Sequence, residues 1–356
     1  MPLSTINKKA LPLAISAGEP AGIGPEVILK SWIERHRRDL PAFFVIGNPQ
    51  IFQKTARKLG LDVPMHIIEA PDQTQDVFLD HLPLYDHGPE TEHKVGAEFQ
   101  FGSPSVTTAA GTIDAIKRAV EFIFEGDAAG LITAPIQKSV LYDAGFSCPG
   151  HTEYLAELCQ TITSQPEAPV MMLVSEYLRV VPLTIHIPLR DVSRAITADL
   201  ITRICTKITT ALRQDFGIEK PRITVAGLNP HAGENGAMGD EDEQIIRPAI
   251  DKLRDLGMNI SGPLPADTLF HKAARATYDA ALCMYHDQAL IPIKTLDFDG
   301  GVNVTLGLPI IRTSPDHGTA LNIAGQNLAR ADSMINAIKL ADKIYQNRQN
   351  WAKKNV

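Results

Sequence analysis

Residues 280–318 read AALCMYHDQALIPIKTLDFDGGVNVTLGLPIIRTSPDHG, and this stretch decides the fold class. Its apolar runs, Ala280 to Met284 and Val302 to Leu306, have the length of buried β-strands. His286 and Arg312 bring metal-binding and charged groups close to the ends of such runs. In open α/β sheets, ligands bind outside the carboxyl ends of the strands. The stretch therefore predicts strands whose ends hold a small anionic molecule beside a metal ion.

The same alternation of strand-like and helix-like segments extends along the chain. From Leu200 to Leu212 an apolar residue recurs every four positions, which predicts a helix, and Gly217 is placed to end it. Ser103 is expected to cap another helix whose first residue is Pro104. This alternation predicts an α/β protein with a mainly parallel or mixed sheet. The other predicted strands are Leu11 to Ala17, Phe43 to Ile46, Gly130 to Thr133, Val170 to Val174, Val180 to Ile185 and Ile223 to Ala226.

Composition limits the class of protein. The 356 residues exceed one ordinary core and suggest two domains, and a 44% apolar content is typical of a globular chain. The net charge of −7 argues against nucleic acid as a partner, because phosphate backbones need a basic surface. The four cysteines have no CxxC spacing, which indicates reduced thiols. The first residues lack a signal-peptide pattern, and the run from Ala10 to Ala17 is too short to span a membrane, so a cytoplasmic location is expected.

Three histidines, His186, His231 and His286, each follow a strand-like run. Three imidazoles at strand ends are able to bind one divalent ion and leave a coordination position open for substrate. The alternative is that each ring makes a structural hydrogen bond. If the ion is bound, Asp287 and Glu234 are placed to orient the rings.

Two groups of residues suggest an anion site. Gly150-His151-Thr152-Glu153 precedes a helical pattern, so the unpaired backbone N–H groups of a helix start would lie beside the side-chain donors of His151 and Thr152. The alternative is that Thr152 only caps the helix. Lys294, Asn303 and Arg312 are able to bind carboxylate and phosphate, although each is alternatively a surface or strand-end residue.

The glycine-rich segment Gly18 to Glu26 directly follows a predicted strand. Glycines at positions 18, 22 and 24 allow the backbone to turn sharply and to approach a ligand closely. Its spacing matches neither the dinucleotide-binding GxGxxG pattern nor the phosphate-binding Walker loop. A tight strand-to-helix turn with no ligand is the alternative.

Taken together, these segments resemble the 4-hydroxythreonine-4-phosphate dehydrogenase family of vitamin B6 (pyridoxine) biosynthesis. The resemblance covers most of the chain beyond a variable stretch from about residue 50 to residue 100, and eight ordered motifs are more specific than any one of them. The motifs are GEPAGIGPE at 18–26, TAPIQK at 133–138, GHTE at 150–153, GLNPHAGE at 227–234, GPLPADTLF at 262–270, MYHDQ at 284–288, GGVNVTLGLPIIRTS at 300–314 and DHGTA at 316–320.

The resemblance implies a two-domain α/β/α fold of the isocitrate and isopropylmalate dehydrogenase type, with mixed sheets and the active site in the cleft between domains. The first domain would combine residues 1–130 and 300–356, and the second would comprise residues 131–299 with the metal ligands and dimer contacts. The implied assembly is a homodimer whose subunits share each active site.

The resemblance also implies roles for individual residues. The metal ligands would be His186, His231 and His286, with one ring coming from the partner subunit and zinc, magnesium or cobalt as the ion. The substrate would contact His151, Thr152, Lys294, Asn303 and Arg312. The cofactor, NAD or NADP, would lie against Gly18, Glu19, Gly22, Gly24, Asp316, His317, Gly318 and Asn322.

The implied reaction is the oxidation of 4-hydroxythreonine 4-phosphate at its 3-hydroxyl, with hydride transfer to the nicotinamide. The product carries a carboxylate β to a carbonyl, so it would readily lose carbon dioxide. Lys294 and Asp267 are the two candidates for the proton acceptor. Alternatives are a dehydrogenase of threonate or erythronate phosphate, a metal-dependent hydrolase that needs no nicotinamide, and a binding protein without activity.

Overall fold

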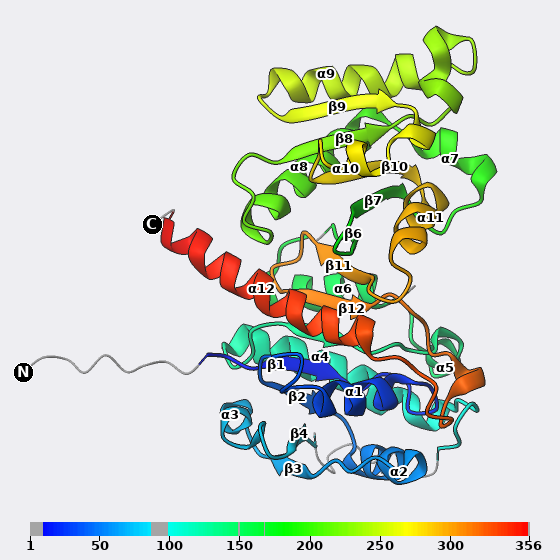
Figure 1. Ribbon diagram of the computed structural model, residues 1–356. Helices are drawn as coiled ribbons and strands as arrows, with labels where there is room; N and C mark the ends of the chain where they lie inside the picture. Colours follow the sequence, from blue (N-terminus) through cyan, green and yellow to red (C-terminus); the bar gives the residue numbers. More distant parts are fainter. Residues whose placement is uncertain (1–9, 87–98, 149, 167, 355–356) are drawn as a thin grey trace, which may run out of the picture. The chain divides into compact units, whose positions relative to one another are not determined.

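The computed structural model describes residues 10–86, 99–148, 150–166 and 168–354 (Figure 1). The opening residues 1–9, in which no signal peptide was expected, lie outside the described residues. The chain divides into two compact units: unit 1 falls within Met1–Gln165 and Ile310–Asp342, and unit 2 within Pro166–Pro309 and Lys343–Val356. These boundaries differ from the expected ones near residues 130 and 300, because the strand at Leu131–Thr133 and the helix at His151–Thr163 pack with N-terminal elements.

Unit 1 contains a parallel sheet in the order β3-β4-β2-β1-β5-β12. Its central strands β2, β1 and β5 consist mainly of apolar residues, and every residue of β1 and β2 is buried. Such continuous apolar runs are typical of parallel strands covered on both faces. The strands are β1 Leu13–Ser16, β2 Phe43–Ile46, β3 Met65–Ile68, β4 Leu82–Tyr85, β5 Leu131–Thr133 and β12 Arg312–Pro315.

Unit 2 contains a mixed sheet in the order β11-β6-β7-β10-β8-β9. β11, β6 and β7 pair antiparallel, whereas β7, β10, β8 and β9 run parallel. The strands are β6 Val170–Val174, β7 Arg179–Thr184, β8 Arg222–Ala226, β9 Asn259–Leu264, β10 Ala280–Tyr285 and β11 Val302–Leu306. The predicted α/β class with parallel and mixed sheets is confirmed, and all eight predicted strands are present.

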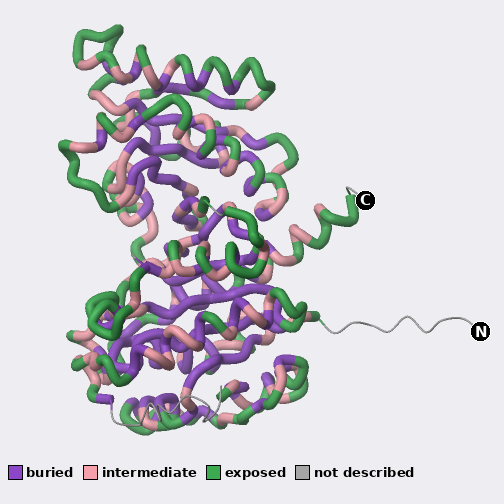
Figure 2. Tube along the Cα trace, turned by 180° about the vertical axis from the view of Figure 1, so that it is seen from behind, coloured by how far each residue is buried: buried purple, intermediate pink, exposed green. Residues whose placement is uncertain are grey.

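The helices lie beside these strands, and Figure 2 shows the strands as mostly buried and the helices as exposed on one side. The predicted helix around Leu200 is present as α8, where Ile204, Ile208 and Leu212 are buried, and Gly217 follows it with a φ of +69°. Unit 1 contains α1 Gly24–Ile33, α2 Pro49–Leu59, α3 Thr74–Val77, α4 Ala109–Glu125, α5 Lys138–Asp143 and α6 His151–Thr163. Unit 2 contains α7 Leu189–Ala195, α8 Ala198–Gln214, α9 Arg247–Asp255, α10 Lys272–Arg275 and α11 His286–Leu296, and α12 Asp332–Lys354 is divided between the units after Asp342.

One predicted helix start is wrong. α4 begins at Ala109 rather than at Pro104, after a short 3₁₀ turn at Val106–Thr108. Ser105, not Ser103, caps that turn by accepting a hydrogen bond from the Thr107 amide at 3.4 Å. The Ser103 amide instead donates to the Gln100 carbonyl at 3.0 Å, which places Ser103 in a preceding turn. Among the described residues, no helix has both the length and the apolar character needed to cross a bilayer.

Candidate active site

The three predicted metal ligands follow three neighbouring parallel strands of unit 2. β10 lies between β7 and β8, and all three run in the same direction, so their carboxyl ends share one edge of the sheet. His186 comes two residues after β7, and His286 is the first residue of α11, directly after β10. His231 lies in the turn Pro230–Gly236 that follows β8. The fold therefore brings all three segments to the edge where α/β proteins bind ligands.

Two of the three rings lie side by side. The ring centroids of His186 and His286 are 5.9 Å apart, with the planes tilted by 41°. The Nδ1 atom of His286 lies 2.7 Å from Oδ1 of Asp287. Because a carboxylate only accepts hydrogen bonds, this contact requires the proton on Nδ1, the arrangement that turns Nε2 toward a metal ion in such sites. This is how a carboxylate orients a metal-binding imidazole, and Asp287 occupies the position expected for such a partner.

His231 belongs to an exposed turn with an unusual backbone. His231, Ala232, Gly233, Glu234 and Asn235 are five consecutive residues with positive φ, and only one of them is glycine. A left-handed conformation costs roughly 1–2 kcal/mol for each residue with a side chain. Such strain persists only where the surroundings hold it, and it is common at functional sites.

Within the part of the chain that the structure describes, no three His, Cys, Asp or Glu side chains lie close enough together to hold a metal ion. One chain therefore joins His186 and His286, but does not add His231 to them. The metal site of three histidines therefore stays a prediction.

Side-chain hydrogen bonds join the three histidine-bearing strand ends. The Thr184 hydroxyl at the end of β7 donates to the Met284 carbonyl on β10 at 2.8 Å. The Met284 amide donates to Oε1 of Gln288 at 2.7 Å, and Nε2 of Gln288 donates to the Gly227 carbonyl after β8 at 2.9 Å. Gln288 thus extends the contact between β10 and β8 beyond their backbone pairing. Sequence reasoning quoted Gln288 only as part of a motif and missed this role.

The two candidate proton acceptors lie in different surroundings within unit 2. Exposed Asp267 lines a cavity of about 400 Å³ together with Phe270, Asp287 and Gln288. Half-buried Lys294 lies on α11, eight residues after His286, with its ammonium 5.6 Å from the Phe298 ring centroid. Asp267 is therefore the candidate that shares a cavity with the carboxylate oriented toward His286.

Asn303 lies on β11 and is half-buried. Its Oδ1 atom is buried and has no hydrogen-bond partner in the structure. A buried acceptor without a donor is unfavourable, because it has given up water without replacement. A ligand that donates a hydrogen bond would satisfy this atom, as the predicted substrate contact requires.

In unit 1, a buried cation and a helix N-terminus form a compact anion site. Arg312 on β12 is only 4% exposed, and its Nη2 and Nε atoms donate to the Thr133 hydroxyl at 2.7 and 3.2 Å. Burial lowers the pKa of Arg312 to about 10, against an opposing effect of Glu153, so the guanidinium stays charged at neutral pH. His151 is the first residue of α6. Thr152 follows it half-buried and does not cap the helix, so that alternative is wrong.

The electrostatics of His151 fit an anion site. Burial, followed by the charges of Arg312 and Lys138, holds the pKa of His151 well below its usual range. Its Nε2 atom is buried without a hydrogen-bond partner. Lys138 was not singled out from the sequence, although its Nζ atom lies 3.3 Å from where a side chain at Gly150 would begin. Arg312 and Lys138 therefore act on an imidazole that is neutral at neutral pH and that stands at the N-terminus of α6, the helix end that favours anions.

The glycine-rich segment and the segment around His317 also lie together in unit 1. A Cβ atom at Gly22 would lie 2.8 Å from the Thr319 carbonyl, to which the Ile23 amide donates at 3.0 Å. Gly18 has a φ of +73°, and a Cβ atom there would lie 2.5 Å from the Pro135 carbonyl. The two segments predicted to border the cofactor are thus neighbours, with Gly24 opening α1 and Asn322 exposed in the turn Leu321–Ile323.

Three of the residues predicted to contact the cofactor make hydrogen bonds to neighbouring residues of their own unit. Buried Glu19 accepts from the Ala21 amide at 3.0 Å, and its burial raises the pKa of the carboxyl group. The Asp316 amide donates to the Ser333 hydroxyl at 3.0 Å, and Nδ1 of His317 lies 3.1 Å from the Gly318 carbonyl. These contacts shape the two segments, so a cofactor would meet mainly their backbone.

Comparisons of this chain with a family model, with protein sequences and with solved structures all find the same family. A family model described as "Pyridoxal phosphate biosynthetic protein PdxA" matches residues 39–341. A 4-hydroxythreonine-4-phosphate dehydrogenase of Methylorubrum populi is 50% identical over 339 residues, which cover 95% of this chain and 96% of the relative. One of Caulobacter vibrioides is 50% identical over 334 residues, covering 94% and 97%. The crystal structure of the dehydrogenase of that name from Klebsiella pneumoniae matches with a TM-score of 0.82 and 36% identity, covering 95% and 100%.

Proposed function

Because this chain belongs to the family of the pyridoxal phosphate biosynthetic protein PdxA, we propose that it is a nicotinamide-linked, metal-dependent 4-hydroxythreonine-4-phosphate dehydrogenase. It would oxidise the 3-hydroxyl of its substrate to give 2-amino-3-oxo-4-phosphooxybutanoate, which loses carbon dioxide to give 3-amino-2-oxopropyl phosphate. The observation that carries the proposal is the pair of adjacent imidazoles at His186 and His286, with Asp287 fixing the second ring.

The donor set fits a divalent metal ion. His186, His231 and His286 would hold it, with one ring supplied by the partner subunit of a homodimer. When bound, the ion would supply Lewis acidity that polarises the substrate oxygen. Asp287 holds the tautomer of His286, and the Thr184–Met284–Gln288–Gly227 bonds fix the spacing of the strand ends. Zinc, cobalt and magnesium are the ions to compare, because imidazole ligands favour zinc without excluding the others.

The anion site of unit 1 suits the phosphate or carboxylate of the substrate. Arg312 is held by two hydrogen bonds to the Thr133 hydroxyl, and its buried guanidinium would attract an anion. His151 is neutral, so its Nε2 atom would donate a hydrogen bond to an anionic oxygen without adding a buried charge. Thr152 adds a hydroxyl at the same helix end.

In unit 2, Lys294 and Asn303 would contact the polar groups of the substrate. Asn303 would use its buried, unpaired Oδ1 atom to accept a hydrogen bond. Asp267, in the cavity beside Asp287, and Lys294 remain the two candidates that would accept the hydroxyl proton. A fixed orientation of substrate relative to the nicotinamide is what these contacts would supply to the reaction.

NAD or NADP would lie against the neighbouring segments at residues 18–24 and 316–322 of unit 1. Gly22 permits the close approach of Thr319, and the hydroxyl of Thr319 donates to Oε1 of Gln137 at 2.9 Å. These contacts would keep the backbone of both segments in place for the cofactor. We place the enzyme in the cytoplasm, in keeping with four described cysteines that are all buried and form no disulfide.

The test measures reduced-nicotinamide absorbance with 4-hydroxythreonine 4-phosphate. NAD⁺ and NADP⁺ are compared, each with zinc, cobalt or magnesium, and each with and without a chelator. We expect absorbance that depends on both substrate and metal. A much higher kcat/KM with threonate or erythronate 4-phosphate would replace the proposed substrate. Metal-dependent phosphate release without any nicotinamide would instead indicate a hydrolase.

A further inference from the structure

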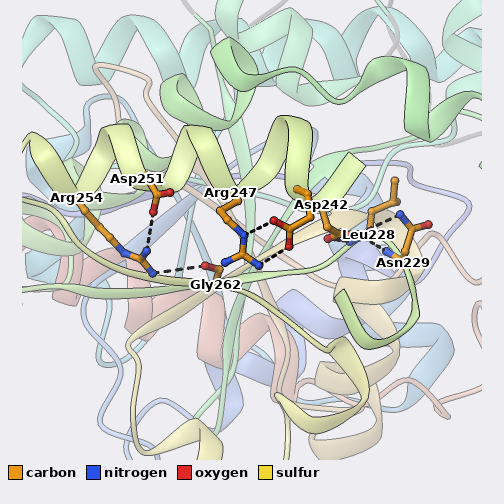
Figure 3. A network of polar contacts seen from close by, with 8 residues as sticks. Leu228, Asn229, Asp242, Arg247, Asp251, Arg254 and Gly262 are labelled. Atoms are coloured by element: carbon orange, nitrogen blue, oxygen red, sulfur yellow. Dashed lines mark hydrogen bonds and ion pairs between the residues drawn. The ribbon is translucent and has the colours of Figure 1, made fainter. Parts of the chain in front are cut away.

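The strained turn that carries His231 is built around one buried carboxylate. Asp242 is 0% exposed and begins a π-helical turn, Asp242–Ile246, directly before α9. Its Oδ1 atom accepts the Leu228 amide at 2.9 Å, and its Oδ2 atom accepts the Asn229 amide at 3.0 Å. Oδ2 also accepts Nδ2 of Asn229 at 3.1 Å, and Figure 3 shows the carboxylate beside both residues. Asp242 thus binds both backbone amides that lead into the turn, and Oε2 of Glu241 accepts a further bond from Nδ2 of Asn229 at 2.8 Å.

Glycines allow the turn to wrap around this carboxylate. A Cβ atom at Gly227 would lie 2.8 Å from Oδ1 of Asp242 and 2.8 Å from Cα of Ala232. At Gly233 it would lie 3.3 Å from Cβ of Asp242 and 2.9 Å from the Gly239 carbonyl. Side chains at these two positions would push the turn away from Asp242. The turn and the carboxylate therefore fit each other closely.

Asp242 makes these bonds outside the sheet. β8 is held by backbone pairing with β9 and β10, up to Ala226 and Val225 respectively. Leu228 and Asn229 lie beyond the last paired residues, so their amides depend on Asp242. Loss of the carboxylate would leave the sheet paired and release the segment just before His231.

We infer that Asp242 is a positioning residue for the metal ligand His231: it holds the left-handed turn so that the imidazole is preorganised for the ion. The inference rests on the proposed function, because it assumes that His231 binds the metal. A buried group that orients a metal ligand commonly contributes ten- to a hundred-fold to metal affinity.

The experiment compares Zn²⁺ dissociation constants of the full-length protein, measured by competition with a chelator. Asp242→Asn keeps one acceptor oxygen and places an amide N–H₂ against a backbone donor. Asp251→Asn is the matched control, because Asp251 is exposed and lies on the adjacent α9. Figure 3 shows its carboxylate bound to Arg254, at 2.8 Å, and not to the turn. His231→Ala tests the ligand itself.

We expect Asp242→Asn to weaken Zn²⁺ binding at least tenfold, and Asp251→Asn to change it less than about twofold. Hydrogen exchange adds a second readout: the amides of Leu228 and Asn229 should exchange faster in Asp242→Asn, while those of Ile223 to Val225 stay protected. If Asp242→Asn does not fold, Asn229→Ala replaces it. That variant removes the Nδ2 bonds to Asp242 and Glu241, keeps both backbone bonds to Asp242, and should weaken binding about threefold to tenfold.

Two outcomes overturn the inference, and they differ. If His231→Ala loses Zn²⁺ while Asp242→Asn, or Asn229→Ala in its place, binds as wild type does, the positioning role is wrong and the ligand assignment stands. If His231→Ala binds Zn²⁺ as wild type does, the proposed ligand is wrong and the positioning role is lost with it.

Discussion

Replacing Gln288 with leucine should destabilise the protein because two buried backbone groups lose their partners. The Gln288 amide accepts from the Met284 amide at 2.7 Å and donates to the Gly227 carbonyl at 2.9 Å. Met284 and Gly227 are buried, so water does not readily replace these bonds. Each unsatisfied buried group costs about 1–3 kcal/mol. Gln288 itself is half-buried, so the lower part of the summed range applies, about 2–3 kcal/mol.

The assay is thermal unfolding of the metal-free protein, followed by the same measurement with Zn²⁺. A loss of about 2–3 kcal/mol lowers Tm by roughly 4–12 °C in a unit of this size. Because Gln288 links the segments of His231 and His286, the rise in Tm caused by Zn²⁺ should also shrink. Gln326→Leu is the control: Gln326 is exposed and makes a surface bond to the Asn322 carbonyl at 2.7 Å. If both variants shift Tm equally and Zn²⁺ stabilises both as it does wild type, the reasoning about the strand ends is refuted.

Three further predictions concern the anion site and the metal ligands. Arg312→Ala should raise KM about ten- to a hundred-fold with a smaller change in kcat, since it removes charge-assisted hydrogen bonds to substrate. Steady-state kinetics will check this, with Arg203→Ala as the control because Arg203 is exposed. An unchanged KM in Arg312→Ala would contradict the substrate contact. His151→Gln should lose less stability at acid pH than wild type does. The pKa of His151 is depressed in the folded protein, so below about pH 6.5 the unfolded chain takes up this proton first and wild type is destabilised as pH falls. Tm of the metal-free proteins is measured against pH, and equal slopes for wild type and variant would contradict the prediction. The alanine variants of His186, His231 and His286 are mixed in pairs, and two of the three mixtures should regain about a quarter of the wild-type sites. A mixed dimer regains one intact site only when the pair includes the histidine that crosses between subunits. Activity in none of the mixtures would mean that each site is built by one chain.

Strands were predicted correctly from the sequence where burial requires apolar side chains along most of the strand. β2, β6 and β11 are short apolar runs, and their predicted bounds are those observed. β3 was missed because His66 and Ile67 are exposed, which weakens the apolar pattern. β12 was missed because its first residue is Arg312, a charged side chain that is buried beside Thr133. A buried charged side chain thus stands where the apolar pattern of a strand would have an apolar one.

The candidate site shows the same limit at the level of single residues. His151, His286 and Arg312 stood out because each lies in one of the ordered motifs and carries a side chain suited to metal or anion binding. Gln288 and Asp242 were missed because they act on backbone groups, and any glutamine or aspartate in the sequence is able to do so. Only the fold shows which amides and carbonyls lie within reach.

The arrangement of the strand ends explains why such backbone contacts matter in this protein. Parallel strands are held in register by their ladder, but the ladder between β10 and β8 ends before the histidine-bearing segments begin. Beyond that point, each segment would move independently, and a metal site tolerates displacements of only a fraction of an ångström. Thr184, Gln288 and Asp242 supply hydrogen bonds where the ladder stops. The three residues that lead into the strained turn at His231 are therefore each bound by a side chain: Gln288 binds the carbonyl of Gly227, and Asp242 binds the next two amides.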